Sequence, residues 1–290
     1  MTEWLLAPFQ YGFMREAFTI AAIIAVPAAL LSCFLVLKGW SLMGDAVSHA
    51  VLPGVVLAYI LGAPLVAGAF VAGVLCALAA GFLQENSRVK QDTVLGVVMS
   101  GMFAAGMVLY VAIPSSMDLY HILFGNIFGV TEGQIIRTAI IALLVSAAIL
   151  TNWRDLALHS FDPVQARVVG LPVRWLHYGL LAAISLTVVA MLSAVGIILA
   201  VGLLIAPGAI AFLLTRRMQA MLAAASAVSL FSCLGGVWIS FWIDSAPAPT
   251  IVMVLTAIFV AAFIWRQIRN RSATQGVTAT AEAKLTAAPR

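Results

Sequence analysis

Long apolar runs constrain this chain more than any other feature of its sequence. Runs of about 20 apolar residues, the length of helix that crosses a hydrocarbon core of ~30 Å, follow one another along nearly the whole chain. Residues are 63% hydrophobic and 9% charged, with a mean hydropathy of +1.11, whereas a soluble domain is about one-quarter charged. The sequence therefore predicts an all-α integral membrane protein.

The runs are bounded by charge, Gly or Pro and predict about nine spans in a polytopic helical bundle. The alternative is eight spans, if residues 39 to 50 form a short helix outside the hydrocarbon core. We expect a single transmembrane domain over 1–270, followed over 271–290 by a disordered cytoplasmic tail rich in Ala and Thr. The expected spans are 17 to 38, 42 to 62, 65 to 83, 92 to 113, 134 to 152, 174 to 193, 196 to 214, 219 to 241 and 248 to 268.

The basic residues predict the orientation, because Lys and Arg accumulate in cytoplasmic loops. With the N-terminus outside and the C-terminus in the cytoplasm, only Arg15 and Arg137 of the 15 basic residues lie on the outer side. The net charge of +4 then reflects topology, and we infer no nucleic-acid partner from it.

A weak internal repeat relates the two halves. A shift of 154 residues lays the first four spans over the last four and brings Pro53-Gly54 to Pro207-Gly208. The shift covers an odd number of spans, so the halves would be inverted in the membrane, as in many transporters whose substrate path lies between the repeats.

Asp45 and His49 are the ionisable pair that the spans contain. Residues four apart share a helix face, and Ser41 and Ser48 would extend the polar stripe. Ionisable groups inside a membrane are expensive and commonly functional.

Carboxylate and imidazole are ordinary ligands of divalent manganese, iron and zinc, and two ligands would hold an ion loosely, as a pathway requires. The alternative is that Asp45 caps a helix while His49 is a packing residue.

The longest inner loop contains a second candidate site. Asp162-Pro163 is typical of a helix start, and Gly170 followed by Pro172 is typical of a stop, so a short helix is expected there. Such a helix could dock into a groove on a soluble partner. A surface connector is the alternative that composition alone favours.

Other polar residues are weaker candidates. Asp118 and His121 could meet an incoming cation on the outer side, and His159 and His177 are expected to be exposed or interfacial. The chain has no G-x-x-x-x-G-K-[ST] loop and no H-E-x-x-H motif, so we expect neither ATP hydrolysis nor zincin chemistry, no enzyme activity and no bound cofactor.

The stretch Leu37-Lys-Gly-Trp-Ser-Leu-Met-Gly-Asp-Ala-Val-Ser-His-Ala-Val-Leu-Pro-Gly54 resembles the signature of the ABC-3 family, the membrane permeases of ABC importers for zinc, manganese and iron. Phe161 to Pro172 is similar to that family's coupling segment, with Asp162, Ala166 and Gly170 at matching positions. Val164-Gln165 departs from it, because many members carry an acidic residue there. Lys38-Gly-Trp and Tyr120 to Asn126 are closer to the manganese and chelated-iron branch.

The resemblance implies a type II-like ABC importer in a bacterial inner membrane. Its implied partners are a second permease subunit, identical or homologous, two cytoplasmic ATPase subunits that hydrolyse ATP, and an extracytoplasmic metal-binding protein. Asp45 and His49 would be transient ligands of the transported metal. Asp162, Pro163, Ala166 and Gly170 would belong to the ATPase-coupling loop.

Two other functions remain open at this point. A permease for a metal chelate, such as a siderophore or cobalamin, would share the architecture but leaves the pair unexplained. A gradient-driven secondary carrier would use Asp45 to shuttle protons and would need no ATPase.

Overall fold

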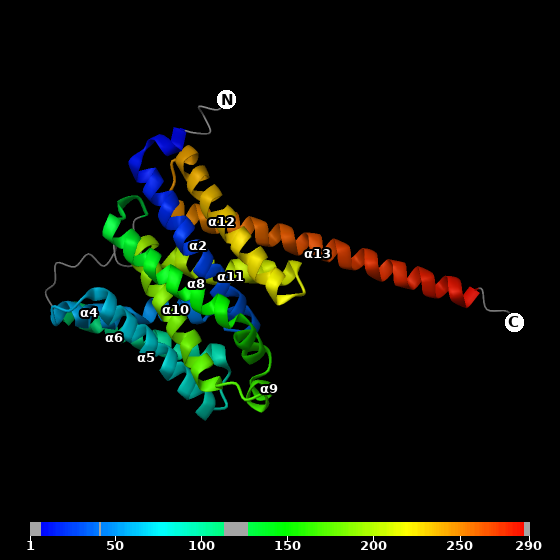
Figure 1. Ribbon diagram of the computed structural model, residues 1–290, viewed down its shortest axis with the longest axis horizontal. Coiled ribbons are helices and arrows are strands. Elements are labelled where there is room, and N and C mark those ends of the chain that lie inside the picture. Colours follow the sequence, from blue (N-terminus) through cyan, green and yellow to red (C-terminus); the bar gives the residue numbers. More distant parts are fainter. Residues whose placement is uncertain (1–6, 41, 113–126, 287–290) are drawn as a thin grey trace.

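The computed structural model describes residues 7–40, 42–112 and 127–286, and every regular element in these ranges is a helix (Figure 1). Nine helical segments of the described chain are long and apolar enough to cross a membrane, which confirms the predicted count. The elements are η1 (Ala7–Gln10), α2 (Gly12–Lys38), α3 (Met43–Ala50), α4 (Leu52–Ile60), α5 (Leu65–Asn86), α6 (Gln91–Ala112), η2 (Ile127–Gly129), α8 (Glu132–Phe161), α9 (Pro163–Val168), α10 (Val173–Val195), α11 (Ile197–Leu214), α12 (Met218–Ile243) and α13 (Pro247–Thr286).

The second span is divided into two helices. α3 and α4 meet at Val51, and Pro53 lies in the first turn of α4, where its missing N–H is not needed. The sequence predicted a single run from 42 to 62. The proline therefore starts a new helix inside the span and leaves α3 as a separate short helix that carries Asp45 and His49.

Two other helices are longer than the apolar runs predicted. α8 continues past residue 152 to Phe161, with a kink at Asn152, whose backbone is non-helical. α13 continues as helix to Thr286 over the segment for which we expected no regular structure. Proline is absent from the chain between Pro249 and Pro289, so no residue of that type interrupts the helix after it leaves the bundle (Figure 1).

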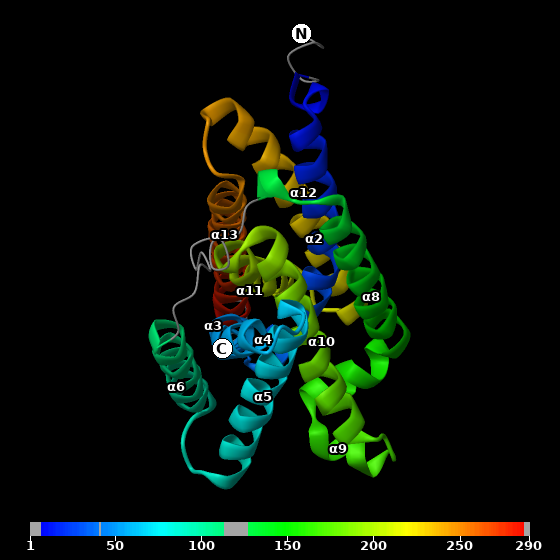
Figure 2. The same cartoon turned by 90° about the vertical axis from the view of Figure 1, so that its left-hand side faces the viewer.

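The first helix of each half packs into the other half. α2 packs against α11 and α12, whereas α10 packs against α3 and α5. α8 lies against both α2 and α10 (Figure 2). This reciprocal exchange of α2 and α10 is the packing that a repeat of 154 residues predicts.

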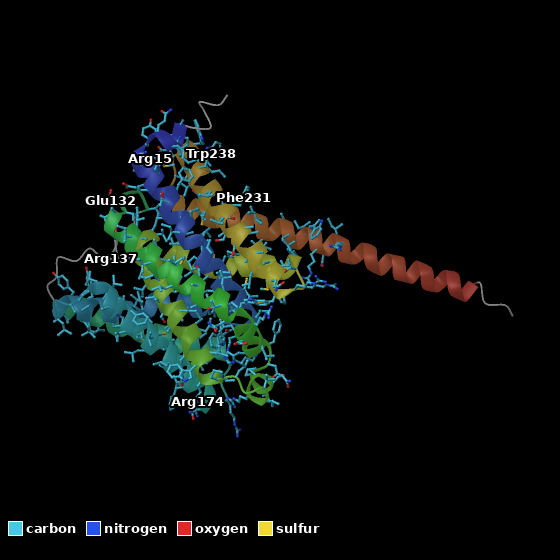
Figure 3. The ribbon with its side chains drawn as sticks, viewed as in Figure 1. Arg15, Glu132, Arg137, Arg174, Phe231 and Trp238 are labelled. Atoms are coloured by element: carbon cyan, nitrogen blue, oxygen red, sulfur yellow. The ribbon has the colours of Figure 1, made fainter. Side chains whose placement is uncertain are left out.

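The two halves also run in opposite directions. Arg15, at the start of α2, lies toward one end of the bundle, and Arg174, at the start of α10, lies at the other (Figure 3). The inverted repeat predicts this arrangement, because equivalent first helices must enter from opposite ends.

Glycine allows close helix crossings in both halves. Gly54 of α4 and Gly68 of α5 face each other, so that a Cβ on either would collide with the backbone of the other helix. Gly208 of α11 lies against Ser32 of α2, where a Cβ would come within 2.5 Å of the Ser32 backbone. Both Pro-Gly pairs of the repeat therefore mark helix crossings.

Candidate functional site

A tight turn separates α2 from the site helix. α2 ends at Gly39, whose φ of +70° lies in the left-handed region that glycine adopts without strain. The amides of Gly39 and Trp40 donate to the carbonyls of Val36 and Leu35 and satisfy the last turn of α2. α3 begins four residues later, so the turn fixes where Asp45 enters the bundle.

Asp45 and His49 face each other on α3. The His49 Nε2 atom lies 3.4 Å from Asp45 Oδ1, as the spacing of four residues predicts. The side chain of His49 is 34% exposed and that of Asp45 is 32% exposed, although their helix belongs to an apolar span. The pair is therefore accessible from outside the packed core.

Asp45 does not cap a helix, which was the alternative to its role as a metal ligand. The N-cap of α3 is Leu42, no side chain makes a capping hydrogen bond there, and Asp45 lies in the first turn of the helix. A carboxylate in the first turn is favourable beside the positive end of the helix dipole.

The other faces of α3 are closed by neighbouring helices. Gly44 faces Leu204 of α11, and Val47 faces Gly73 of α5. The His49 ring meets Phe103 of α6 in an edge-to-face arrangement with centroids 5.5 Å apart. One open face of α3 thus presents a carboxylate and an imidazole beside α6.

The predicted polar stripe is shorter than expected. Ser48 is buried, and its hydroxyl donates to the carbonyl of Gly44 at 2.7 Å, so it does not join the open face. Ser48 is three residues from Asp45 but only one from His49, which turns it toward the core. Ser41 lies outside the described residues.

No group of three His, Cys, Asp or Glu residues suited to a metal ion occurs in the part of the chain that the structure describes. Asp45 and His49 can therefore supply two ligands, an oxygen and a nitrogen, and an ion held here would take its remaining ligands from water or another chain. Asp118 and His121, and the segment from Tyr120 to Asn126, lie outside the described residues.

The second predicted site forms the short helix α9. Asp162 is its N-cap, and Oδ1 accepts hydrogen bonds from the amides of Val164 and Gln165, both at 2.9 Å. Pro163 occupies the first turn and Ala166 is the buried residue of the helix. Gly170, with φ of +85°, ends the segment. The predicted start and stop of the helix are confirmed.

A polar cluster that the sequence did not predict lies beside α9. His159 is 2% exposed, which contradicts the expectation that it is exposed or interfacial. Its Nε2 atom lies 2.9 Å from the ammonium of Lys38. The two residues are 121 positions apart, so no local pattern could have paired them. The burial follows from the extension of α8 past residue 152, which brings His159 back against the end of α2.

The described part of the chain combines nine spans with an accessible carboxylate and imidazole in a broken span, an arrangement typical of the membrane domain of a transport protein. The chain belongs to the ABC 3 transport family, whose pattern it matches over residues 10–266.

Curated relatives span most of the chain. It is 53% identical over 262 residues to the chelated iron transport system membrane protein YfeD of Yersinia pestis, covering 90% of this chain and 88% of that protein. It is 44% identical to the manganese transport system membrane protein MntB of Synechocystis, covering 90% of this chain and 86% of that protein.

Solved structures agree with the fold. The chain superposes on PsaBC from Streptococcus pneumoniae in complex with Fab with a TM-score of 0.81 and 34% identity, over 91% of this chain and 95% of that one. A putative metal-chelate type ABC transporter in an inward-facing conformation gives a TM-score of 0.66 over 88% of this chain and 86% of that one. At 18% identity the latter shows the fold alone.

Proposed function

We propose that this protein is the permease subunit of an ATP-driven importer that carries divalent manganese or iron into the cytoplasm. The relatives named for manganese and chelated iron transport support this cargo. The accessible Asp45–His49 pair carries the proposal, because oxygen and nitrogen ligands suit these ions.

A site with two protein ligands suits an ion that passes through better than an ion that is stored. A site that holds an ion in transit must bind it and then release it. Two side chains from one subunit, with water or a second subunit completing the coordination, meet that requirement. Asp45 and His49 are transient ligands in this scheme, and zinc is a further cargo that the same donors would accept.

Transport would depend on partners. Two cytoplasmic ATPase subunits supply ATP hydrolysis, a second permease subunit completes the path, and an extracytoplasmic protein delivers the metal. In the bacterial inner membrane the N-terminus would lie outside and α9 inside, because Lys38 and Arg174 lie with Arg167 of α9 around one cavity, and Lys and Arg accumulate on the cytoplasmic side. The preformed and capped α9 is then the ATPase contact.

The cargo is tested by measuring cellular manganese, iron and zinc by mass spectrometry in a metal-starved strain. The chain is expressed with its ATPase and binding protein, and compared with the same set carrying Asp45→Ala or His49→Ala. We expect manganese or iron to rise only with the intact set, while all proteins remain in the membrane. Normal accumulation with either variant would reject these ligands, and accumulation without the ATPase would indicate a secondary carrier.

The role of α9 is tested with Asp162→Ala, which removes its two capping hydrogen bonds and costs about 1 kcal/mol of local helix stability. We expect less ATPase to co-purify with the permease and slower transport. Thr131→Ala is the matched control, because Thr131 caps α8 through a capping box away from α9. Equal ATPase recovery with both variants would contradict the assignment of α9.

A further inference from the structure

A cavity of about 720 Å³ opens beside α9, among the ends of α2, α8 and α10. It is separate from the Asp45–His49 pair, neither of which lines it. Its polar lining includes Lys38, His159, Arg167, Arg174 and His177. Lys38 and Trp40 of the family signature thus have a place in the fold that ligation of the metal does not explain.

The lining of this cavity is cationic. Three of its residues are Lys or Arg, and no Asp or Glu occurs among the described residues that line it. The nearby carboxylate of Asp162 is engaged with the amides of Val164 and Gln165. A transported cation would be repelled from this cavity, whereas an anion would be attracted.

The buried histidine fixes the position of Lys38. The Lys38 ammonium has only hydrogens to offer, so His159 Nε2 must accept at their 2.9 Å contact. The ring proton is then on Nδ1, which is buried and has no hydrogen-bond partner in the described structure. Lys38 is also held over the Trp40 ring, 4.4 Å from its centroid. These contacts fix the positive charge of Lys38 at the wall of the cavity.

We propose that this cavity binds a phosphate-bearing anion, either the headgroup of an anionic phospholipid or a soluble phosphate. Basic pockets between transmembrane helices on the cytoplasmic side are suited to anionic headgroups, and Arg binds phosphate oxygens in pairs. The cytoplasmic placement rests on the orientation in the proposed function. Arg167 belongs to α9 and Arg174 to α10, so a bound anion would tie the ATPase contact to a span.

The test measures anion binding by the purified full-length chain and needs no metal transport. In one arm the protein is extracted from phosphatidylcholine nanodiscs that contain phosphatidylglycerol, and retained lipid is counted by native mass spectrometry. In the other arm the delipidated protein is titrated calorimetrically with inorganic phosphate. Arg167→Gln and Arg174→Gln change exposed side chains, so folding should survive.

We expect each substitution to weaken binding about fivefold, the effect of one cationic side chain at an anionic surface. Arg174→Lys should restore most of it. Arg154→Gln is the control, because Arg154 lies over Trp153 and does not line the cavity. Retained phosphatidylglycerol without phosphate binding identifies a lipid headgroup, and phosphate binding alone identifies a soluble anion.

Binding of neither probe by the unchanged chain would overturn the proposal. Equal binding by the unchanged chain, Arg167→Gln and Arg174→Gln would also overturn it. Loss of metal uptake by Asp45→Ala with normal anion binding would support both proposals. Anion binding by a chain that transports no metal would overturn only the proposed function.

Discussion

The two halves of the bundle share a plan but use it differently. In the second half, α11 runs unbroken through Pro207, whereas in the first half the chain breaks before Pro53 into α3 and α4. The residues that the 154-residue shift places at Asp45 and His49 are Leu199 and Leu203, and both are 0% exposed. One half thus presents polar groups where the other packs leucine.

A single side chain from α2 accounts for part of this difference. Ser32 donates to the carbonyl of Ile205 at 3.1 Å and accepts from the amide of Gly208 at 2.8 Å. These bonds link α2 to backbone groups of α11 on both sides of Pro207. α11 is thereby held against α2 inside the core, whereas α3 turns an open face toward α6.

The largest effect is expected when the residue types of Asp45 and His49 are placed at Leu199 and Leu203, the equivalent positions of the second half. Leu199→Asp with Leu203→His would bury a carboxylate and an imidazole among apolar side chains that are 0% exposed, at a cost of several kcal/mol. We expect little folded protein, measured by membrane yield and by size-exclusion chromatography in detergent.

The reverse exchange sharpens the comparison. Asp45→Leu with His49→Leu should give normal yield of folded protein and no metal uptake, because this pair is accessible rather than packed. Normal metal uptake by the Asp45→Leu, His49→Leu variant, or normal folding of the Leu199→Asp, Leu203→His variant, would contradict the difference between an accessible site in one half and a packed core in the other.

The next effect concerns the crossing of α11 and α2. Gly208→Ala would place a methyl group within 2.5 Å of Ser32 backbone atoms, and such overpacking costs about 1 to 3 kcal/mol. We expect a lower melting temperature in detergent. Gly235→Ala is the control, since a Cβ there meets no atom within 4 Å. Equal melting temperatures for the two variants would contradict the close crossing.

The smallest effect concerns the hydrogen bonds of Ser32. Ser32→Ala removes both bonds between α2 and α11, and interhelical bonds in membranes contribute about 0.6 kcal/mol each. We expect destabilisation of about 1 kcal/mol, measured by thermal unfolding. Ser226→Ala should cost less, because Ser226 donates only to Leu222 of its own helix. A larger loss at Ser226 would reject the role given to Ser32.

The sequence predicted what depends on local patterns. Apolar runs predicted the spans because each span meets the same lipid requirement, and the four-residue spacing predicted that Asp45 and His49 share a face. Asp162-Pro163 and Gly170 predicted α9 because caps are read from a few neighbouring residues. The continuation of α8 past Asn152 was missed, because apolar character alone does not locate the end of a helix. A separate short helix in the second span was considered only as the alternative over residues 39 to 50, and α3 covers Met43–Ala50.

The sequence by itself therefore determined that this chain is a helical membrane protein, where its apolar runs lie, and which ionisable pair lies within them. Only the tertiary structure decided that Asp45 and His49 remain accessible while Leu199 and Leu203 are buried. It also brought Lys38 to His159 across 121 residues. The physical reason is that exposure and long-range contact depend on which helices pack together, and this packing depends on side chains far apart in the chain.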